Sequence, residues 1–147
     1  VFCMLLFFRM WKSLLFVIVL SEILYPSGPS AVSKSIRKEY HYVSMSKTWA
    51  DAQSYCRKMF TDLATVENQD DNSKLLENSW IGLHRDKWAS WSDGKPTTFT
   101  NWNESQPDNS GKSASSCAVV NTTTGTWWDV NCWDYHYFIC QKFKNLV

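Results

Sequence analysis

Hydrophobic and polar positions alternate first with the period of a strand and then with the period of a helix. Residues 39–45 alternate and carry aromatic side chains, which predicts a β-strand. The stretch from Thr48 to Asp51 resembles a capping box, which marks the start of a helix. Apolar residues then recur at helical spacing, at Ala52, Tyr55, Cys56 and Met59. The pattern predicts a helix with Cys56 on its buried face.

A second helix is predicted over residues 68–78, with Leu75 and Leu76 as its core contacts. Asp70 and Asp71 then fall in its first turn, where carboxylates suit the helix dipole. Short strands follow, over residues 80–83, 88–91, 117–121, 126–129 and 137–143. Residues 97–116 show little periodicity and predict a long loop, and such loops in compact domains are often functional. Two early helices followed by short strands indicate an α+β fold.

Composition narrows the classes of protein that this chain can belong to. Its 147 residues suit one domain with a hydrophobic core, and nine tryptophans indicate a core rich in large rings. The net charge of +1 gives no electrostatic case for binding nucleic acid. His41, His84 and His136 accompany no nucleophile or metalloprotease motif, so we do not expect an enzyme.

The first residues of the chain have the pattern of a secretory signal peptide. Arg9 and Lys12 precede the apolar run 14–20, and small residues follow it. We assign residues 1–21 to the signal, with its end between Ser21 and Ser30, and expect a secreted chain without a membrane span. The alternative, a type II membrane anchor, would place both basic residues in the bilayer at about 2.5–3.5 kcal/mol each.

Cysteine usage agrees with an oxidising compartment. Cys3 falls in the predicted signal, which leaves an even number of cysteines, namely Cys56, Cys117, Cys132 and Cys140. The chain has no C-x-x-C pair and its histidines are scattered, so zinc-ligand spacing is absent. Four cysteines allow three disulfide pairings, and their spacing does not choose among them. Asn103-Glu-Ser105 and Asn121-Thr-Thr123 are N-glycosylation sequons in such a chain.

Several motifs in order resemble the C-type lectin-like domain over residues 36–144. They are Cys56, WIGL (80–83), WSDG (91–94), FTNW (99–102), QPD (106–108), Cys117, WWD (127–129), Cys132 and FIC (138–140). The resemblance implies the short form of that fold: two helices, short antiparallel strands and a long ligand loop. It also implies the disulfides Cys56–Cys140 and Cys117–Cys132. Trp80, Trp91 and Trp102 fall on framework positions and are expected in the core, while Trp88, Trp128 and Trp133 can face a ligand.

The resemblance also implies a site for sugar and Ca²⁺. Gln106, Asp108 and Asp129 match positions whose oxygens bind both, and the Gln-Pro-Asp order is similar to the galactose-type version. The family's acidic ligand before Cys117 is Ser115 here, and its amide beside the aspartate is Trp128. Calcium takes six to eight oxygen ligands, so these two losses should weaken any calcium site. Trp128 retains a ring that can stack on a sugar.

Two functions follow from this resemblance. The first is a secreted lectin that binds glycans or glycoproteins through Gln106, Asp108, Asp129 and Trp128. The alternative is a calcium-independent module that binds a protein or another non-sugar ligand, because one fold serves many ligands. A glycan on Asn103, three residues from Gln106, would crowd the sugar-binding face.

Overall fold

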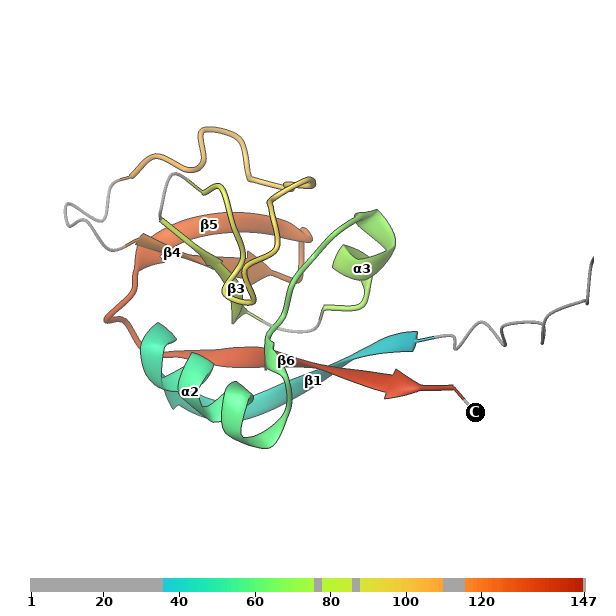
Figure 1. Ribbon diagram of the computed structural model, residues 1–147. Coiled ribbons are helices and arrows are strands. Elements are labelled where there is room, and N and C mark those ends of the chain that lie inside the picture. Colours follow the sequence, from blue (N-terminus) through green and yellow to red (C-terminus); the bar gives the residue numbers. More distant parts are fainter. Residues whose placement is uncertain (1–35, 76–77, 86–87, 110–115, 147) are drawn as a thin grey trace, which may run out of the picture. The chain divides into compact units, whose positions relative to one another are not determined.

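The structure is a computed structural model that describes residues 36–75, 78–85, 88–109 and 116–146 (Figure 1). The predicted signal peptide, Cys3, Leu76 and Ser115 lie outside these residues. In the described part of the chain, no helix has both the length and the apolar character that a membrane span requires.

The first and last strands form a long antiparallel pair. β1 (Ile36–Lys47) pairs with β6 (His136–Asn145), from Ile36 opposite Asn145 to Val43 opposite Phe138. Both strands are longer than the predicted stretches 39–45 and 137–143. Their outer residues are mostly exposed and lack an alternating burial signal, so each strand is extended by its partner rather than by its own pattern.

Helix α2 (Trp49–Met59) begins as the sequence predicts. The Thr48 hydroxyl accepts a hydrogen bond from the Asp51 N–H (3.3 Å) and donates to its Oδ2 (2.7 Å), which confirms the cap. Cys56 is fully buried, but Met59 is 54% exposed, contrary to the prediction that it belongs to the apolar face. Met59 is the last residue of the helix, where the chain turns away toward β2 (Asp62–Leu63).

Helix α3 spans Gln69–Ser73 only, so the prediction of a helix over residues 68–78 was wrong in length. The segment has no apolar face that could extend it, and it is held by polar contacts. Asn68 caps it by accepting from the Asp71 N–H (2.8 Å). Asp71 is 7% exposed and pairs with the Lys38 ammonium (2.6 Å), so its carboxylate links α3 to β1. Leu75 is buried, as predicted.

The remaining strands complete one sheet in the order β1-β6-β3-β4-β5, with β2 paired to β6. They are β3 (Ser79–His84), β4 (Ser116–Asn121) and β5 (Thr126–Asn131). The predicted hairpin of residues 117–121 and 126–129 is therefore confirmed. The predicted strand 88–91 is wrong: Trp88 has a positive φ of 55°, and pairing is limited to isolated bridges at Ser90 and Trp91.

Large rings fill the core, as the composition indicates. Trp80, Trp91 and Trp127 are almost fully buried, whereas Trp102, expected in the core, is only half-buried and packs at its margin. Trp127 contacts Trp91, Phe99 and Trp102 edge-to-face, with ring centroids 5.7–5.8 Å apart. The disulfides Cys56–Cys140 and Cys117–Cys132 are both present, as the resemblance implies.

Candidate ligand site at the edge of strand β5

The long loop is held along the outer edge of β5. The Trp127 N–H donates to the Asn101 carbonyl (2.8 Å), and the Asn103 N–H donates to the Trp127 carbonyl (2.9 Å). Trp102 forms a parallel bridge with Trp127. These contacts satisfy backbone groups that an edge strand would otherwise expose, and they fix the register of the loop before Gln106. In Figure 1 the loop arches over β5, on the side away from β6 and β1.

The Gln106-Pro107-Asp108 motif continues this edge. The Gln106 N–H donates to the Asn103 carbonyl (3.0 Å), and the Gln106–Pro107 peptide bond is cis. Ser105 (φ 68°) and Asn109 (φ 55°) on either side have left-handed backbones. The motif is therefore bounded by two sharp changes in chain direction.

Two hydrogen bonds join the motif to β5. The Asp129 N–H donates to Gln106 Oε1 (3.2 Å), and the Asp108 N–H donates to Asp129 Oδ1 (2.9 Å). Asp129 is only 4% exposed, and its Oδ2 is buried without a hydrogen-bond partner. A desolvated carboxylate oxygen without a partner is costly, so this atom is a candidate ligand for a cation. The structure therefore brings Gln106, Asp108 and Asp129 together, although they are up to 23 residues apart.

Trp128 belongs to the same strand but has a different environment. Its side chain is 40% exposed, while its neighbours Trp127 and Asp129 are buried. Successive side chains alternate along a strand, which agrees with an exposed Trp128 between two buried neighbours. Its ring is therefore open to solvent on the strand that carries Asp129.

These residues do not fit a calcium centre of ordinary strength. Gln106 Oε1 and Asp129 Oδ1 already accept hydrogen bonds from the backbone. At the position of Trp128 the indole offers an N–H donor where an oxygen ligand would be needed. Among the described residues, no group of three or more Asp, Glu, His or Cys side chains could hold a metal. The buried Oδ2 of Asp129 fits a cation, but the rest of the donor set falls short of six oxygens.

The two sequons lie in different surroundings. The Asn103 Nδ2 donates to Thr126 Oγ1 (3.1 Å), which ties that side chain to β5. The Asn121 Oδ1 accepts from the N–H groups of Thr123 (3.0 Å) and Thr124 (3.4 Å) in the turn between β4 and β5. Asn103 therefore lies beside the candidate site, and Asn121 lies at the far end of the hairpin.

The three histidines do not form a common centre. His41 stacks on Phe60, and His84 packs edge-on to Trp49. His136 packs edge-on to Trp80 with a centroid distance of 4.6 Å. Each ring therefore lies against a different aromatic partner, an arrangement typical of packing.

Two polar residues that position the site were not predicted from the sequence. Asn101 supports the turn before β5 by donating from Nδ2 to the Gly125 carbonyl (2.6 Å), and Asn72 reaches the same carbonyl from α3 (2.8 Å). These contacts span 24 and 53 residues, and no local pattern announces them. Asn101 lies within the FTNW motif and Asn72 within the predicted helix, but neither pattern indicates these contacts.

Comparison with known proteins identifies the family to which this fold belongs. The family model "Lectin C-type domain" matches residues 45–142. A lectin of Pleurodeles waltl is 31% identical over 118 residues, covering 69% of this chain and 68% of that protein. C-type lectin BfL-2 of Bungarus fasciatus is 33% identical over 120 residues, covering 69% and 75%. The chain belongs to the C-type lectin domain family.

Solved structures agree with this assignment. The carbohydrate-recognition domain of the mouse scavenger receptor C-type lectin superposes with a TM-score of 0.64 at 28% identity. The match covers 75% of this chain and 91% of that domain. The fold predicted from the order of the motifs, with its two disulfides, is confirmed.

Proposed function

We propose that this protein is a secreted lectin that binds glycans at the edge of β5, through Gln106, Asp108 and Trp128. The pair of hydrogen bonds that joins the Gln-Pro-Asp motif to Asp129 carries this proposal. It fixes the Gln106 amide, the Asp108 backbone and the Asp129 carboxylate at one edge, and fixed polar groups are what a small hydroxylated ligand requires. Membership of a family whose relatives are named as lectins supports the same conclusion.

The proposed sugar class is galactose-type. An amide before the proline and a carboxylate after it offer a different order of donors and acceptors from the reverse arrangement, so they select a different pair of sugar hydroxyls. Trp128 offers an exposed ring against which the apolar face of a sugar can stack. Asp129 acts as a positioning residue, because its Oδ1 holds the Asp108 backbone.

Binding is proposed to proceed without an essential calcium ion. The donor set is too small for an ordinary calcium centre. Gln106 Oε1 and Asp129 Oδ1 already accept backbone hydrogen bonds, and the Trp128 indole has no oxygen to offer. Calcium, where it is bound, would be held by Gln106, Asp108 and Asp129 and would supply a positive charge to orient sugar hydroxyls. The protein groups alone supply the hydrogen bonds and the stacking ring.

Retention on immobilised galactose tests the proposal. We expect the full chain to be retained, to be eluted by free galactose but not by mannose, and to behave alike with calcium and with a chelator. The double variant Gln106→Ala/Asp108→Ala should lose retention. Glu104→Gln, an exposed change two residues before Gln106, is the matched control and should keep it. No retention in either buffer would rule out this sugar class.

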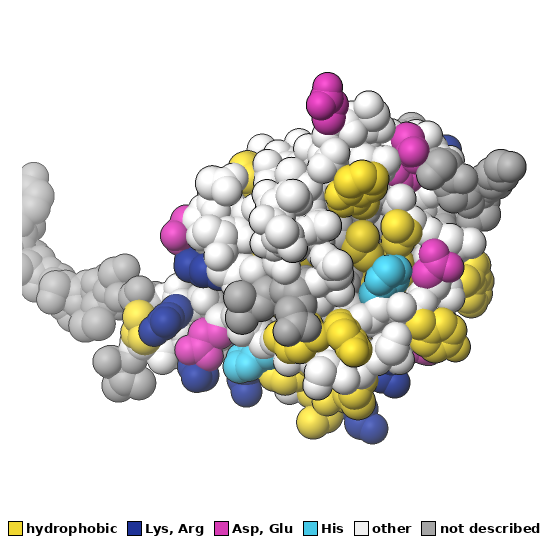
Figure 2. Space-filling model, turned by 180° about the vertical axis from the view of Figure 1, so that it is seen from behind, with side chains coloured by type: hydrophobic (Ala, Val, Ile, Leu, Met, Phe, Trp, Pro, Cys, Tyr) yellow, Lys and Arg dark blue, Asp and Glu magenta, His cyan; other side chains and the backbone are white. Residues whose placement is uncertain are grey.

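A second candidate is a protein ligand. Trp133 is 70% exposed and Trp128 is 40% exposed, and exposed tryptophans are enriched at the centres of protein interfaces. Figure 2 shows hydrophobic side chains gathered over one face of the molecule. Under this alternative, Trp133→Ala abolishes capture of a protein from extracellular fluid, whereas Gln106→Ala/Asp108→Ala leaves it intact.

A further inference from the structure

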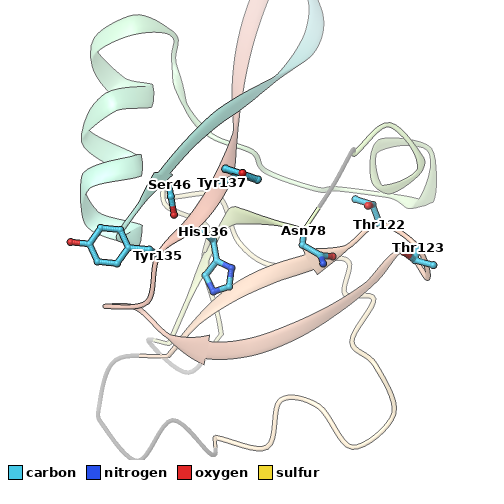
Figure 3. Close-up of a pocket in the computed structure, with 7 residues that line it drawn as sticks. All are labelled: Ser46, Asn78, Thr122, Thr123, Tyr135, His136 and Tyr137. Atoms are coloured by element: carbon cyan, nitrogen blue, oxygen red, sulfur yellow. The ribbon is translucent and has the colours of Figure 1, made fainter.

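An open groove of about 540 Å³ lies away from the Gln-Pro-Asp motif. It is bounded by the end of β1, the residue before β3, the turn between β4 and β5, and the beginning of β6. Figure 3 shows Tyr135 at one end of the groove, the two threonines at the other, and His136 between them. Its lining consists of Ser46, Asn78, Thr122, Thr123, Tyr135, His136 and Tyr137.

The described lining is polar and uncharged. Hydroxyl, amide and imidazole groups surround the groove, and none of its described lining residues is Lys, Arg, Asp or Glu. Tyr135 is 68% exposed and Tyr137 is 43% exposed, so both rings are presented to solvent rather than used in the core. Donors and acceptors without net charge, beside exposed rings, suit a neutral polyhydroxylated ligand better than an anion or a cation.

The groove is held in shape by the core beneath it. His136 packs edge-on to Trp80, which is fully buried and donates its indole N–H to the Lys47 carbonyl (2.8 Å). Tyr137 packs edge-on to Tyr42, with ring centroids 5.8 Å apart. These contacts limit the conformations of the two rings before a ligand arrives, which lowers the entropy cost of binding.

The state of His136 agrees with a neutral ligand. Burial lowers the pKa of its imidazole, and the opposing attraction of the Asp134 carboxylate is the smaller effect. At neutral pH the ring is therefore uncharged, with one nitrogen as donor and the other as acceptor. Such a group can bridge sugar hydroxyls of either orientation.

We propose that this groove is a second carbohydrate-binding site, which takes one or two neutral sugar residues without a metal ion. It shares no residue with the edge of β5. Along the β4–β5 ladder, Asn121 pairs with Thr126 at the groove end, and Ala118 pairs with Asp129 further along. The two pairs are three steps apart along the strand, which is about 10 Å. The groove can therefore bind a sugar whether or not the proposed galactose site does.

Two sources can supply a neutral sugar to the groove. One is a glycan on this chain, because Thr122 and Thr123 line the groove and belong to the sequon of Asn121. The Asn121 side chain is held in the turn by the Thr123 N–H, so a sugar attached there would begin at the rim. The other source is a glycan of a separate molecule. The chemistry of recognition is the same for both.

Titration of the unglycosylated full chain tests the site. The disaccharide N,N′-diacetylchitobiose and, separately, lactose are added in the presence of a chelator, and backbone amide resonances are followed by NMR. We expect saturable shifts at millimolar sugar for residues 122, 123 and 135–137, and at least a fivefold weaker affinity in Tyr135→Ala/Tyr137→Thr. Trp133→Ala removes an equally exposed ring outside the groove and should leave affinity unchanged. Asp129→Asn should also leave it unchanged.

The proposal is overturned if neither sugar shifts these resonances, or if the tyrosine variant binds as well as the parent chain. A second arm uses chain made in secretory cells, with glycosylation of Asn121 verified by mass spectrometry. If added sugar no longer shifts the groove and Asn121→Gln, which removes the sequon without changing a lining residue, restores the response, the chain's own glycan is the occupant. An undiminished response in the glycosylated chain assigns the groove to glycans of other molecules.

Discussion

The indole N–H of Trp127 donates to Oδ1 of Asn72, 2.7 Å away in the core, and this bond ties strand β5 to helix α3. The Nδ2 of Asn72 donates in turn to the Gly125 carbonyl (2.8 Å). Asn72 is 3% exposed, so the Trp127 indole depends on it rather than on water, while the Gly125 carbonyl also accepts from Asn101. A five-residue helix without an apolar face therefore holds in place the strand that carries the candidate site.

Replacing Asn72 with Ala should destabilise the fold by about 1–3 kcal/mol, because the buried indole N–H of Trp127 loses its partner, while the Gly125 carbonyl keeps its hydrogen bond from Asn101. Urea denaturation measures this loss. Asp70→Ala on the same helix removes only an exposed ion pair with Lys74 and should cost less than about 1 kcal/mol. Equal losses in the two variants would contradict the role given to Asn72.

The two disulfides should differ in their contribution to stability. Cys117–Cys132 closes 15 residues and should be worth roughly 3 kcal/mol through the entropy of the unfolded chain. Cys56–Cys140 closes 84 residues and should be worth roughly 4.5 kcal/mol by the same relation. Paired Cys→Ala variants in guanidinium titrations should show this order. The reverse order would show that loop length does not govern the difference.

Restoring the missing oxygen ligands should allow calcium to bind and to raise the melting temperature of the chain. The parent chain is expected to show little change of Tm at millimolar calcium, because its donor set is short. Ser115→Glu/Trp128→Asn adds one carboxylate and one amide at the positions that the family resemblance identifies. Calcium should then raise the Tm by several degrees, since a ligand of the native state stabilises it. Trp128→Asn alone is the control, and a parent chain that already responds would refute the donor count.

Stability should fall as the pH drops through the range in which His136 titrates. Its pKa in the fold lies below its ordinary value of 6.5 because burial disfavours the charged ring. The unfolded chain therefore binds the proton first, so stability is complete above pH 6.5 and declines below it until the folded imidazole is protonated. Thermal unfolding from pH 7.5 to 5 should show a shallower slope in His136→Gln.

Carboxylates titrate in a separate, more acidic range. The hydrogen bond from Lys144 lowers the pKa of Glu39, and the hydrogen bond from Lys38 lowers that of Glu67, both from 4.5. Their contributions are thus lost only as the pH falls below about that value. An unchanged slope between pH 7.5 and 5 in His136→Gln would mean that another group causes the decline.

The predictable parts of this fold are those encoded by local spacing. Thr48 and the apolar face after it announce α2, and the hairpin 117–129 is announced by its turn and its short apolar strands. The length of helix α3 was overestimated because its ends are decided by contacts with distant residues, such as that of Asp71 with Lys38. Trp88 looked like part of a strand, although its backbone has a positive φ.

The candidate site likewise has features that the sequence predicts and features that it does not. The resemblance to a family predicted that Gln106, Asp108 and Asp129 belong together, and their hydrogen bonds agree with it. The burial of Asp129 Oδ2 had no sequence signal, since it depends on how the loop covers β5. The groove around His136 also had no sequence signal, because its walls come from four separate segments of the sequence.

The pairing of Ile36 with Asn145 has a practical meaning for handling the protein. β1 and its neighbour β6 lie on the side of the sheet opposite β5, so the domain begins at Ile36 and ends after Asn145 on the side away from the Gln-Pro-Asp motif. A biotin tag or a surface linker joined after residue 147 would therefore anchor the domain with its candidate sugar-binding edge directed away from the support. Immobilised arrays can use that orientation to present many copies of the edge to one multivalent glycan.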